Sequence, residues 1–323
     1  MGAELALVLG AGGNVGLAYH AGVLLSLEHH LGIDLREADV VVGTSAGSIV
    51  AALLRRGLGA EELAAFVVGA PFRDEWLGAE HSLRVAFEQR PRRRVLNLVT
   101  PPTPGQLMRT ARSFGRNRPG AVIAGMLNGA IDISTATAVL DDLGDGWPER
   151  PLRIVAVSRE GRRVVFGRKG QMPRLSLAVA ASCAIPGVFA PVRIDHRSYI
   201  DGGVHSPTNA DVVRDLEPRQ VLVVSPMSCE PATRGRRIDL PLRRRFHRRL
   251  RREVTMLEQR GSVVHVVEPE TDVLSVMGLN MMDSATAIPV LREAFLATGD
   301  RIARGELGEL ARRPAAPASR SRG

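Results

Sequence analysis

Two polar residues far apart in the sequence have surroundings that suit a nucleophile and its base. Ser45 is the centre of a Gly-x-Ser-x-Gly motif that follows the β-branched run Val40–Val42 and precedes small apolar residues. This order is typical of a strand, a tight turn that holds a nucleophilic serine, and a helix. The turn needs small neighbours, and the flanking motif residues are Gly43, Thr44, Ala46 and Gly47.

The best candidate for the base is Asp201. It follows the stretch Ser198–Ile200, and Gly202 and Gly203 come directly after it. Two glycines allow the backbone to turn closely at a strand end. A carboxylate can accept a serine proton when the two groups lie within roughly 2.6–3.2 Å. The alternative interpretation is that Asp201 only caps the loop that follows it.

A glycine-rich loop lies between the apolar run Leu5–Leu9 and a predicted helix. Exposed backbone amides in such a loop can hold an anion, either the phosphate of a dinucleotide or the oxyanion of acyl transfer. The dinucleotide fingerprint is disfavoured, because its third glycine falls on Val15. We therefore expect the amides of Gly12 and Gly13 to form an oxyanion hole. The other residues of this loop are Gly10, Ala11, Asn14, Val15 and Gly16.

The order of the elements predicts that the loop and Ser45 meet. Short strand–helix–strand units place successive parallel strands side by side. The amides of Gly12 and Gly13 would then face the Ser45 hydroxyl. One such donor typically contributes about 3 kcal/mol to the stabilisation of a transition state.

No histidine has surroundings that mark it as a third catalytic group. A triad in the order nucleophile, acid, histidine would need His205, His247 or His265. A dyad of Ser45 and Asp201 needs fewer assumptions.

These motifs together resemble the patatin-like phospholipase family. The resemblance rests on the loop 10–16, the motif 43–47, the turn Asp201-Gly202-Gly203 and the segment 184–191, which reads Ala-Ile-Pro-Gly-Val-Phe-Ala-Pro. It implies a three-layer α/β/α fold with a mainly parallel sheet. It also implies hydrolysis of lipid acyl esters by a Ser–Asp dyad without a metal or cofactor.

Two residues depart from the family's loop, which usually reads Gly-Gly-Gly-x-Arg/Lys-Gly. Ala11 replaces the first glycine, and Val15 stands where the basic residue is expected. The amides remain, so we expect activity to survive. The loss of a positive charge puts the preference for a phosphate-bearing substrate in doubt.

The excess positive charge of the chain is concentrated in one segment. The 323 residues carry a formal net charge of +9. Residues 234–252 hold ten arginines and one acid, Asp239, which gives 10 − 1 = +9. From Pro241 the segment predicts a helix with one apolar stripe, and the stripe consists of Leu242, Phe246, Leu250, Val254 and Leu257.

Three interpretations of this arginine-rich helix stay open. It can be a surface helix packed by its apolar stripe. It can be a peripheral contact with an anionic membrane. It can bind nucleic acid, which is disfavoured because no cluster of stacking aromatic residues accompanies the charge. The membrane contact would use Arg243, Arg244, Arg248, Arg249 and Arg252.

The remaining sequence predicts one cytoplasmic domain, with the membrane contact as an addition. We find no signal peptide and no apolar stretch long enough to span a bilayer. Cys183 and Cys229 are expected to be reduced and structural. Residues 1–311 form the acyl hydrolase domain in this interpretation, and 312–323 form a disordered tail. Residues 57–150 are irregular and are either a lid or plain packing.

Overall fold

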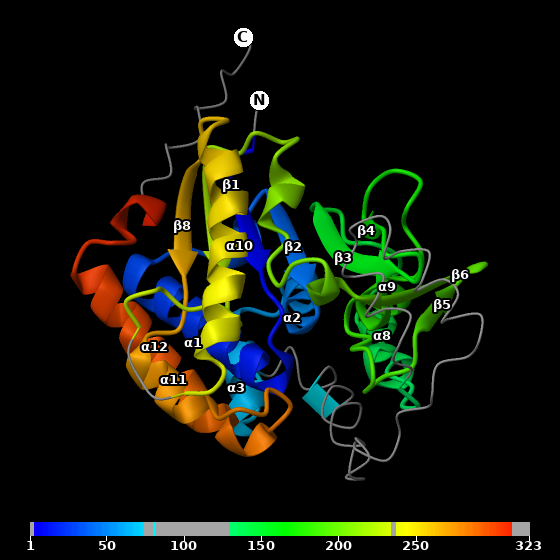
Figure 1. Ribbon diagram of the computed structural model, residues 1–323, viewed down its shortest axis with the longest axis horizontal. Helices are drawn as coiled ribbons and strands as arrows, with labels where there is room; N and C mark the ends of the chain where they lie inside the picture. The colour runs from blue at the N-terminus through cyan, green and yellow to red at the C-terminus, as the bar shows by residue number, and fades with distance from the viewer. Residues whose placement is uncertain (1–2, 74–79, 82–128, 234–236, 312–323) are drawn as a thin grey trace.

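The computed structural model describes residues 3–73, 80–81, 129–233 and 237–311, and it is built around one mixed sheet (Figure 1). The strands follow the order β5-β6-β3-β2-β1-β7-β8, and β4 pairs with β3. Their bounds are β1 Leu5–Leu9, β2 Val40–Thr44, β3 Leu152–Ser158, β4 Arg163–Phe166, β5 Val192–Ile194, β6 Arg197–Asp201, β7 Gln220–Val224 and β8 Val263–Val267.

The centre of the sheet is parallel and one edge is antiparallel. The pairs β1–β2, β1–β7, β2–β3 and β7–β8 are parallel. The pairs β3–β4, β3–β6 and β5–β6 are antiparallel. Every residue of β1, β2 and β3 is buried. Parallel strands covered on both faces have this continuous apolar character.

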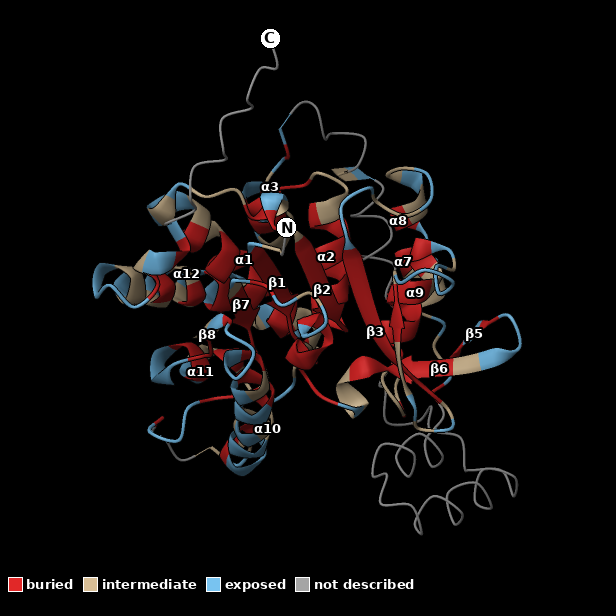
Figure 2. Cartoon of the chain, turned by 90° about the horizontal axis from the view of Figure 1, so that it is seen from above, coloured by how far each residue is buried: buried red, intermediate tan, exposed pale blue. Residues whose placement is uncertain are grey.

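Helices cover the two faces of the sheet unequally (Figure 2). One face packs against the larger cluster of helices: α1 Gly13–Leu31, α2 Ala46–Arg55, α3 Ala60–Val68, α9 Leu175–Ser182, α11 Thr271–Met277 and α12 Ala287–Ala303. The other face packs against α10 Leu240–Glu258 and the short 3-10 helix η5 Ala210–Val213. The expected three-layer α/β/α fold is therefore confirmed.

Short helices complete the described chain. They are η1 Leu35–Glu37, α7 Ser134–Thr137, α8 Val139–Asp142, η4 Gly202–Val204, η6 Ser284–Thr286 and η7 Gly308–Ala311. Most of the irregular region 57–150 and the expected tail 312–323 lie outside the described residues.

The apolar stripe of α10 is only partly in the core. Leu250, Val254 and Leu257 are buried against the sheet and η5, as the sequence predicts. Leu242 is 49% exposed and Phe246 is only half-buried. The interpretation that the stripe packs on the domain therefore fits the last turns of the helix and not the first. Periodicity identifies the apolar face of a helix but not how much of its length has a neighbour.

Candidate active site

Ser45 occupies a strained turn between β2 and α2. Its φ is 52° and its ψ is −125°, a backbone conformation that non-glycine residues rarely adopt. A methyl group on Gly43 would lie 2.4 Å from the Ser48 Cα, and one on Gly47 would lie 2.1 Å from the Leu9 carbonyl oxygen. Both glycines are therefore required by close backbone approach, as the motif predicts.

Asp201 is brought to Ser45 at the end of β6. The Ser45 hydroxyl is close enough to the Asp201 carboxyl to lower its pKa, and Gly203 donates its amide to Asp201 Oδ1 at 2.7 Å. Only 5% of Asp201 and 4% of Ser45 are exposed. Burial raises the pKa of the Asp201 carboxyl to about 6, although the nearby Ser45 hydroxyl and the Gly203 amide oppose this increase. A carboxylate with this pKa is a suitable proton acceptor near neutral pH.

Strand β3 aligns the two residues. Thr44, which precedes Ser45, pairs with Val155, and Asp201 pairs with the next residue, Ala156. The two candidate residues thus enter the site from opposite sides of one strand. Their relative position is set by adjacent positions of β3.

Ser182, which the sequence did not single out, links β3 to the turn of Ser45. Its hydroxyl accepts a hydrogen bond from the Ser45 amide at 2.9 Å and donates to the Val155 carbonyl at 2.6 Å. Ser182 is fully buried. It therefore fixes the backbone of the strained turn against the strand that aligns Asp201.

Asn209, which the sequence also did not single out, links the residue before Ser45 to the residue after Asp201. Its side-chain amide donates to Thr44 Oγ1 at 3.2 Å, to the Gly202 carbonyl at 3.4 Å and to the Ser206 carbonyl at 2.6 Å. The residue is fully buried with a left-handed backbone, φ 52°. Asparagine adopts this left-handed conformation more readily than most residues. This preference is the only property of the sequence that could have pointed to Asn209.

The glycine-rich loop contacts both the Ser45 turn and the Asp201 turn. The Gly47 amide donates to the Gly10 carbonyl at 3.2 Å, and a methyl group on Gly203 would lie 3.4 Å from the Ala11 Cβ. Within the described residues, the amides of Gly12 and Gly13 have no hydrogen-bond acceptor. These amides open α1, where unpaired donors and the helix dipole favour negative charge.

One of the two departures in this loop, Val15, has a structural reason. Val15 is fully buried in the helix-covered core, so an apolar residue suits its position. Its amide donates to the Met281 carbonyl at 3.1 Å. The Asn14 side chain donates to the Met282 carbonyl at 2.9 Å, which ties the loop to a distant segment. Gly16 continues α1 and donates its amide to the Gly12 carbonyl.

Among the described residues, no histidine is hydrogen-bonded to Ser45 or Asp201. His205 lies beside Arg249, with 2.9 Å between its Nε2 and the guanidinium. His247 contacts Glu268 at 2.7 Å, and His265 is in strand β8. His20 contacts the Gly10 carbonyl through Nε2, and its burial lowers its pKa to about 4, which keeps it neutral.

The arginines of α10 fall into two groups, and one expected residue is wrongly assigned. Arg243 is 97% buried, donates to Asp239 and to the Pro226 carbonyl, and cannot face a membrane. Arg244 donates to the Thr233 carbonyl, and Arg249 pairs with Glu253 at 3.3 Å. The arginines of α10 that are exposed and have no side-chain partner among the described residues are Arg245, Arg248, Arg251 and Arg252.

Cys183 and Cys229 are both buried and are not joined in a disulfide. In the part of the chain that the structure describes, no cluster of three or more histidine, cysteine or acidic side chains could hold a metal. No helix of that part is both long and apolar enough to cross a membrane.

Comparison with known proteins identifies the family. Residues 7–214 match the model of the patatin-like phospholipase family. The chain belongs to this family. The match includes the patatin-like glycine loop, the Ser45 turn and the turn at Asp201.

Two solved structures are similar to this patatin-like chain. VipD from Legionella pneumophila is 13% identical with a TM-score of 0.41, and the match covers 93% of this chain and 67% of VipD. The type III effector protein ExoU is 18% identical with a TM-score of 0.36, and the match covers 94% of this chain and 54% of ExoU.

Proposed function

We propose that this protein is a serine hydrolase that cleaves acyl esters of lipids, as a phospholipase A, lysophospholipase or related lipid esterase. One observation carries the proposal: the strained turn of Ser45 and the buried Asp201 are aligned on adjacent positions of β3. Burial raises the pKa of this carboxyl to about 6. Membership of the patatin-like phospholipase family supports a lipid substrate.

In the proposed first half-reaction, Asp201 accepts the proton of Ser45 as Oγ attacks the ester carbonyl carbon. The Gly12 and Gly13 amides hold the resulting oxyanion. When this tetrahedral intermediate collapses, the bond to the alcohol oxygen breaks. Asp201 returns the proton to that oxygen, and the acyl group stays on Ser45.

In the second half-reaction, water attacks the acyl group while Asp201 accepts a proton from the water. The new tetrahedral intermediate collapses with release of the fatty acid. The proton returns to Ser45 Oγ, so the enzyme is regenerated. No metal or cofactor takes part in the proposed reaction.

The test is hydrolysis of phospholipid, lysophospholipid and short-chain ester by wild type, Ser45→Ala and Asp201→Asn. We expect both variants to lose at least about 10³-fold in kcat/KM. Ser275→Ala and Asp300→Asn are matched controls, because both residues are exposed on helices of the outer layer. Equal rates in all five proteins would refute the proposal.

A non-catalytic protein that binds anionic lipid or nucleic acid through α10 is the alternative. A fluorophosphonate probe separates the two, because it labels only an activated serine. Labelling of wild type but not Ser45→Ala supports the hydrolase. Absence of labelling together with salt-sensitive binding to vesicles or RNA supports the alternative.

A further inference from the structure

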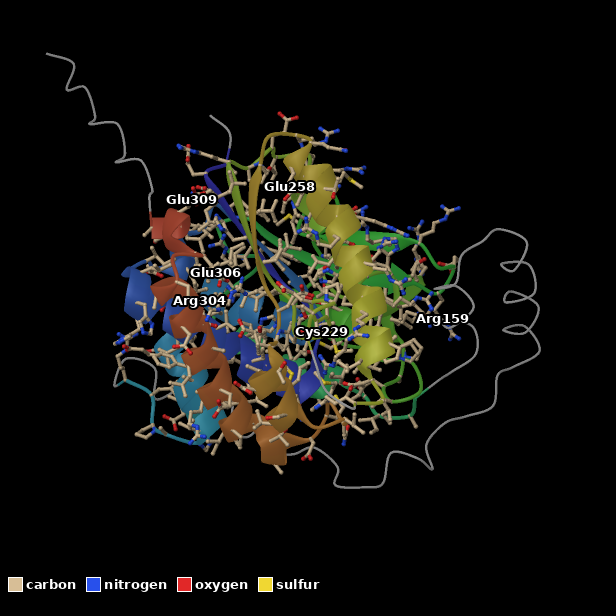
Figure 3. The ribbon with its side chains drawn as sticks, turned by 60° about the vertical axis from the view of Figure 1, so that its left-hand side comes forward. Arg159, Cys229, Glu258, Arg304, Glu306 and Glu309 are labelled. Atoms are coloured by element: carbon tan, nitrogen blue, oxygen red, sulfur yellow. The ribbon has the colours of Figure 1, made fainter. Side chains whose placement is uncertain are left out.

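The outward face of α10 carries positive charge that the described residues do not neutralise. Arg245, Arg248 and Arg252 are spaced by three and four residues, so they lie on one side of the helix. Figure 3 shows α10 along the outside of the molecule, with Cys229 near its first turn and Glu258 at its far end. The acid Glu253 is buried and accepts hydrogen bonds from Thr208 and Ala210, whereas all three arginines are exposed. This row of cations therefore faces outward.

Apolar side chains are exposed beside the first turn of this helix. Ile238 is 83% exposed, Leu242 49% and Leu279 58%. We call these three residues the apolar corner. Exposed apolar groups that lie together indicate a contact surface more often than scattered ones do.

The apolar corner is held together by partly buried ionic contacts. Arg237 donates to the carbonyls of Leu274 and Gly278 and pairs with Asp239 at 2.9 Å. Asp239 also accepts from Arg243 at 2.6 Å. The residues next to these anchors, Ile238 and Leu279, are therefore kept in place although their side chains meet solvent.

The same segment reaches the glycine loop of the candidate site. Leu279 is two residues before Met281, whose carbonyl accepts the Val15 amide and whose sulfur lies 3.6 Å from Arg243. A methyl group on Gly13 would lie 2.5 Å from the Met281 carbonyl oxygen. Leu279 of the apolar corner thus belongs to the segment that packs against the glycine loop.

We propose that the apolar corner and the outward arginines of α10 form one docking surface for a lipid–water interface rich in anionic headgroups. Guanidinium groups bind headgroup phosphates, and the apolar side chains enter the boundary of the acyl chains. Docking would bring the substrate bilayer to the edge of the sheet where Ser45 lies. The idea that docking gives the site access to its substrate rests on the proposed function. The docking itself can be measured without catalysis.

The docking test uses the Ser45→Ala protein, so that vesicles are not hydrolysed during the measurement. Binding to vesicles of phosphatidylcholine with about one third phosphatidylglycerol is compared with binding to pure phosphatidylcholine by flotation. One arginine near an anionic surface changes binding by roughly fivefold. We expect the Arg245→Glu/Arg248→Glu/Arg252→Glu variant to lose at least about 100-fold in partition coefficient.

Two further variants make the result specific. The control Arg150→Glu/Arg219→Glu/Arg292→Glu makes the same change of net charge at exposed residues on α12 and before β3 and β7. It should bind vesicles nearly as well as the parent. Leu242→Ser/Leu279→Ser should lose about tenfold, and this loss should persist at high salt because it is apolar.

Three outcomes would overturn the docking surface. The first is an equal loss of vesicle binding in the two triple-arginine variants, and the second is equal binding of the parent to anionic and pure phosphatidylcholine vesicles. The third is unchanged vesicle binding by Leu242→Ser/Leu279→Ser together with tighter binding of the parent to RNA than to vesicles. Hydrolysis of a water-soluble ester by the same variants with Ser45 restored is measured in parallel. Unchanged kcat/KM there with weakened vesicle binding supports docking. If wild type does not cleave the ester but the docking results hold, only the proposed catalysis fails.

Discussion

The hydroxyl of Ser182 lies between the amide of Ser45 and the carbonyl of Val155, at 2.9 and 2.6 Å. These residues are 137 and 27 positions away in the sequence. One buried side chain therefore connects the proposed nucleophile to the strand that carries Asp201 in register.

Ser182→Ala should lower both stability and activity. The substitution leaves the Ser45 amide without its acceptor, which costs about 1–3 kcal/mol of unfolding free energy. It also loosens the attacking residue, so we expect kcat/KM to fall about 10- to 100-fold. Denaturant unfolding and ester hydrolysis measure the two effects.

The matched control is Ser262→Ala. Ser262 is likewise buried and donates to the Pro218 carbonyl at 2.6 Å, but it lies before β8, away from Ser45. It should lose stability and keep its kcat/KM. A similar loss of kcat/KM in both variants would show that Ser182 has no special effect on the site.

The pH dependence of activity should report Asp201. Its carboxyl accepts a proton only when ionised, and burial raises its pKa to about 6. We therefore expect kcat/KM for a soluble ester to rise tenfold per pH unit below pH 6 and to level off above about pH 7. A profile that is flat, or that falls as pH rises through 6, would contradict this role. Circular dichroism at each pH checks that the protein stays folded.

Asp201→Asn should stabilise the fold above pH 7 while it abolishes activity. Because the folded pKa of about 6 lies above the ordinary value of 3.8, ionisation of this carboxyl opposes folding. The cost is present above the folded pKa and disappears as pH falls through 6 towards 3.8. Roughly two pKa units correspond to at most about 3 kcal/mol.

Thermal unfolding of wild type and Asp201→Asn at pH 7.5 and pH 4.5 tests this linkage. The Tm advantage of the variant should be larger at pH 7.5. An advantage that is equal at both pH values, or larger at pH 4.5, would mean that the charge of Asp201 is not the cause. Asp300→Asn, on an exposed residue, should change Tm little at either pH.

Gly47→Ala tests the packing of the Ser45 turn. Its methyl group would lie 2.1 Å from the Leu9 carbonyl oxygen, so backbone must shift. We expect a loss of at least about 2 kcal/mol in unfolding free energy, together with lower activity. Gly308→Ala is the control, since nothing lies within 4 Å of its added methyl group. Equal stability of the two variants would contradict the close approach.

The sequence predicts the structure well where a short motif determines the local backbone geometry. Ser45, with a glycine two positions away on either side, specifies a turn, and the apolar run before it specifies a buried strand. Asp201-Gly202-Gly203 is equally local. Parallel strands bring the glycine loop and Ser45 to the same edge of the sheet. Asp201 ends β6, which runs antiparallel to β3, so this rule does not predict that it meets Ser45.

The residues that sequence reasoning missed act across long separations. Ser182 and Asn209 gain their roles only when β3, the Ser45 turn and the Asp201 turn are assembled, and no local pattern records that contact. The environment of α10 was missed for the same reason. Charge and periodicity describe the helix, but burial of Arg243 and exposure of Leu242 depend on which neighbours reach it.

The shared alignment of Thr44 and Asp201 on neighbouring positions of β3 has a mechanical consequence. A small displacement of β3 moves the proposed nucleophile and its base in the same direction. The distance between the two groups is therefore less sensitive to such a displacement than the distance from either group to a bound substrate.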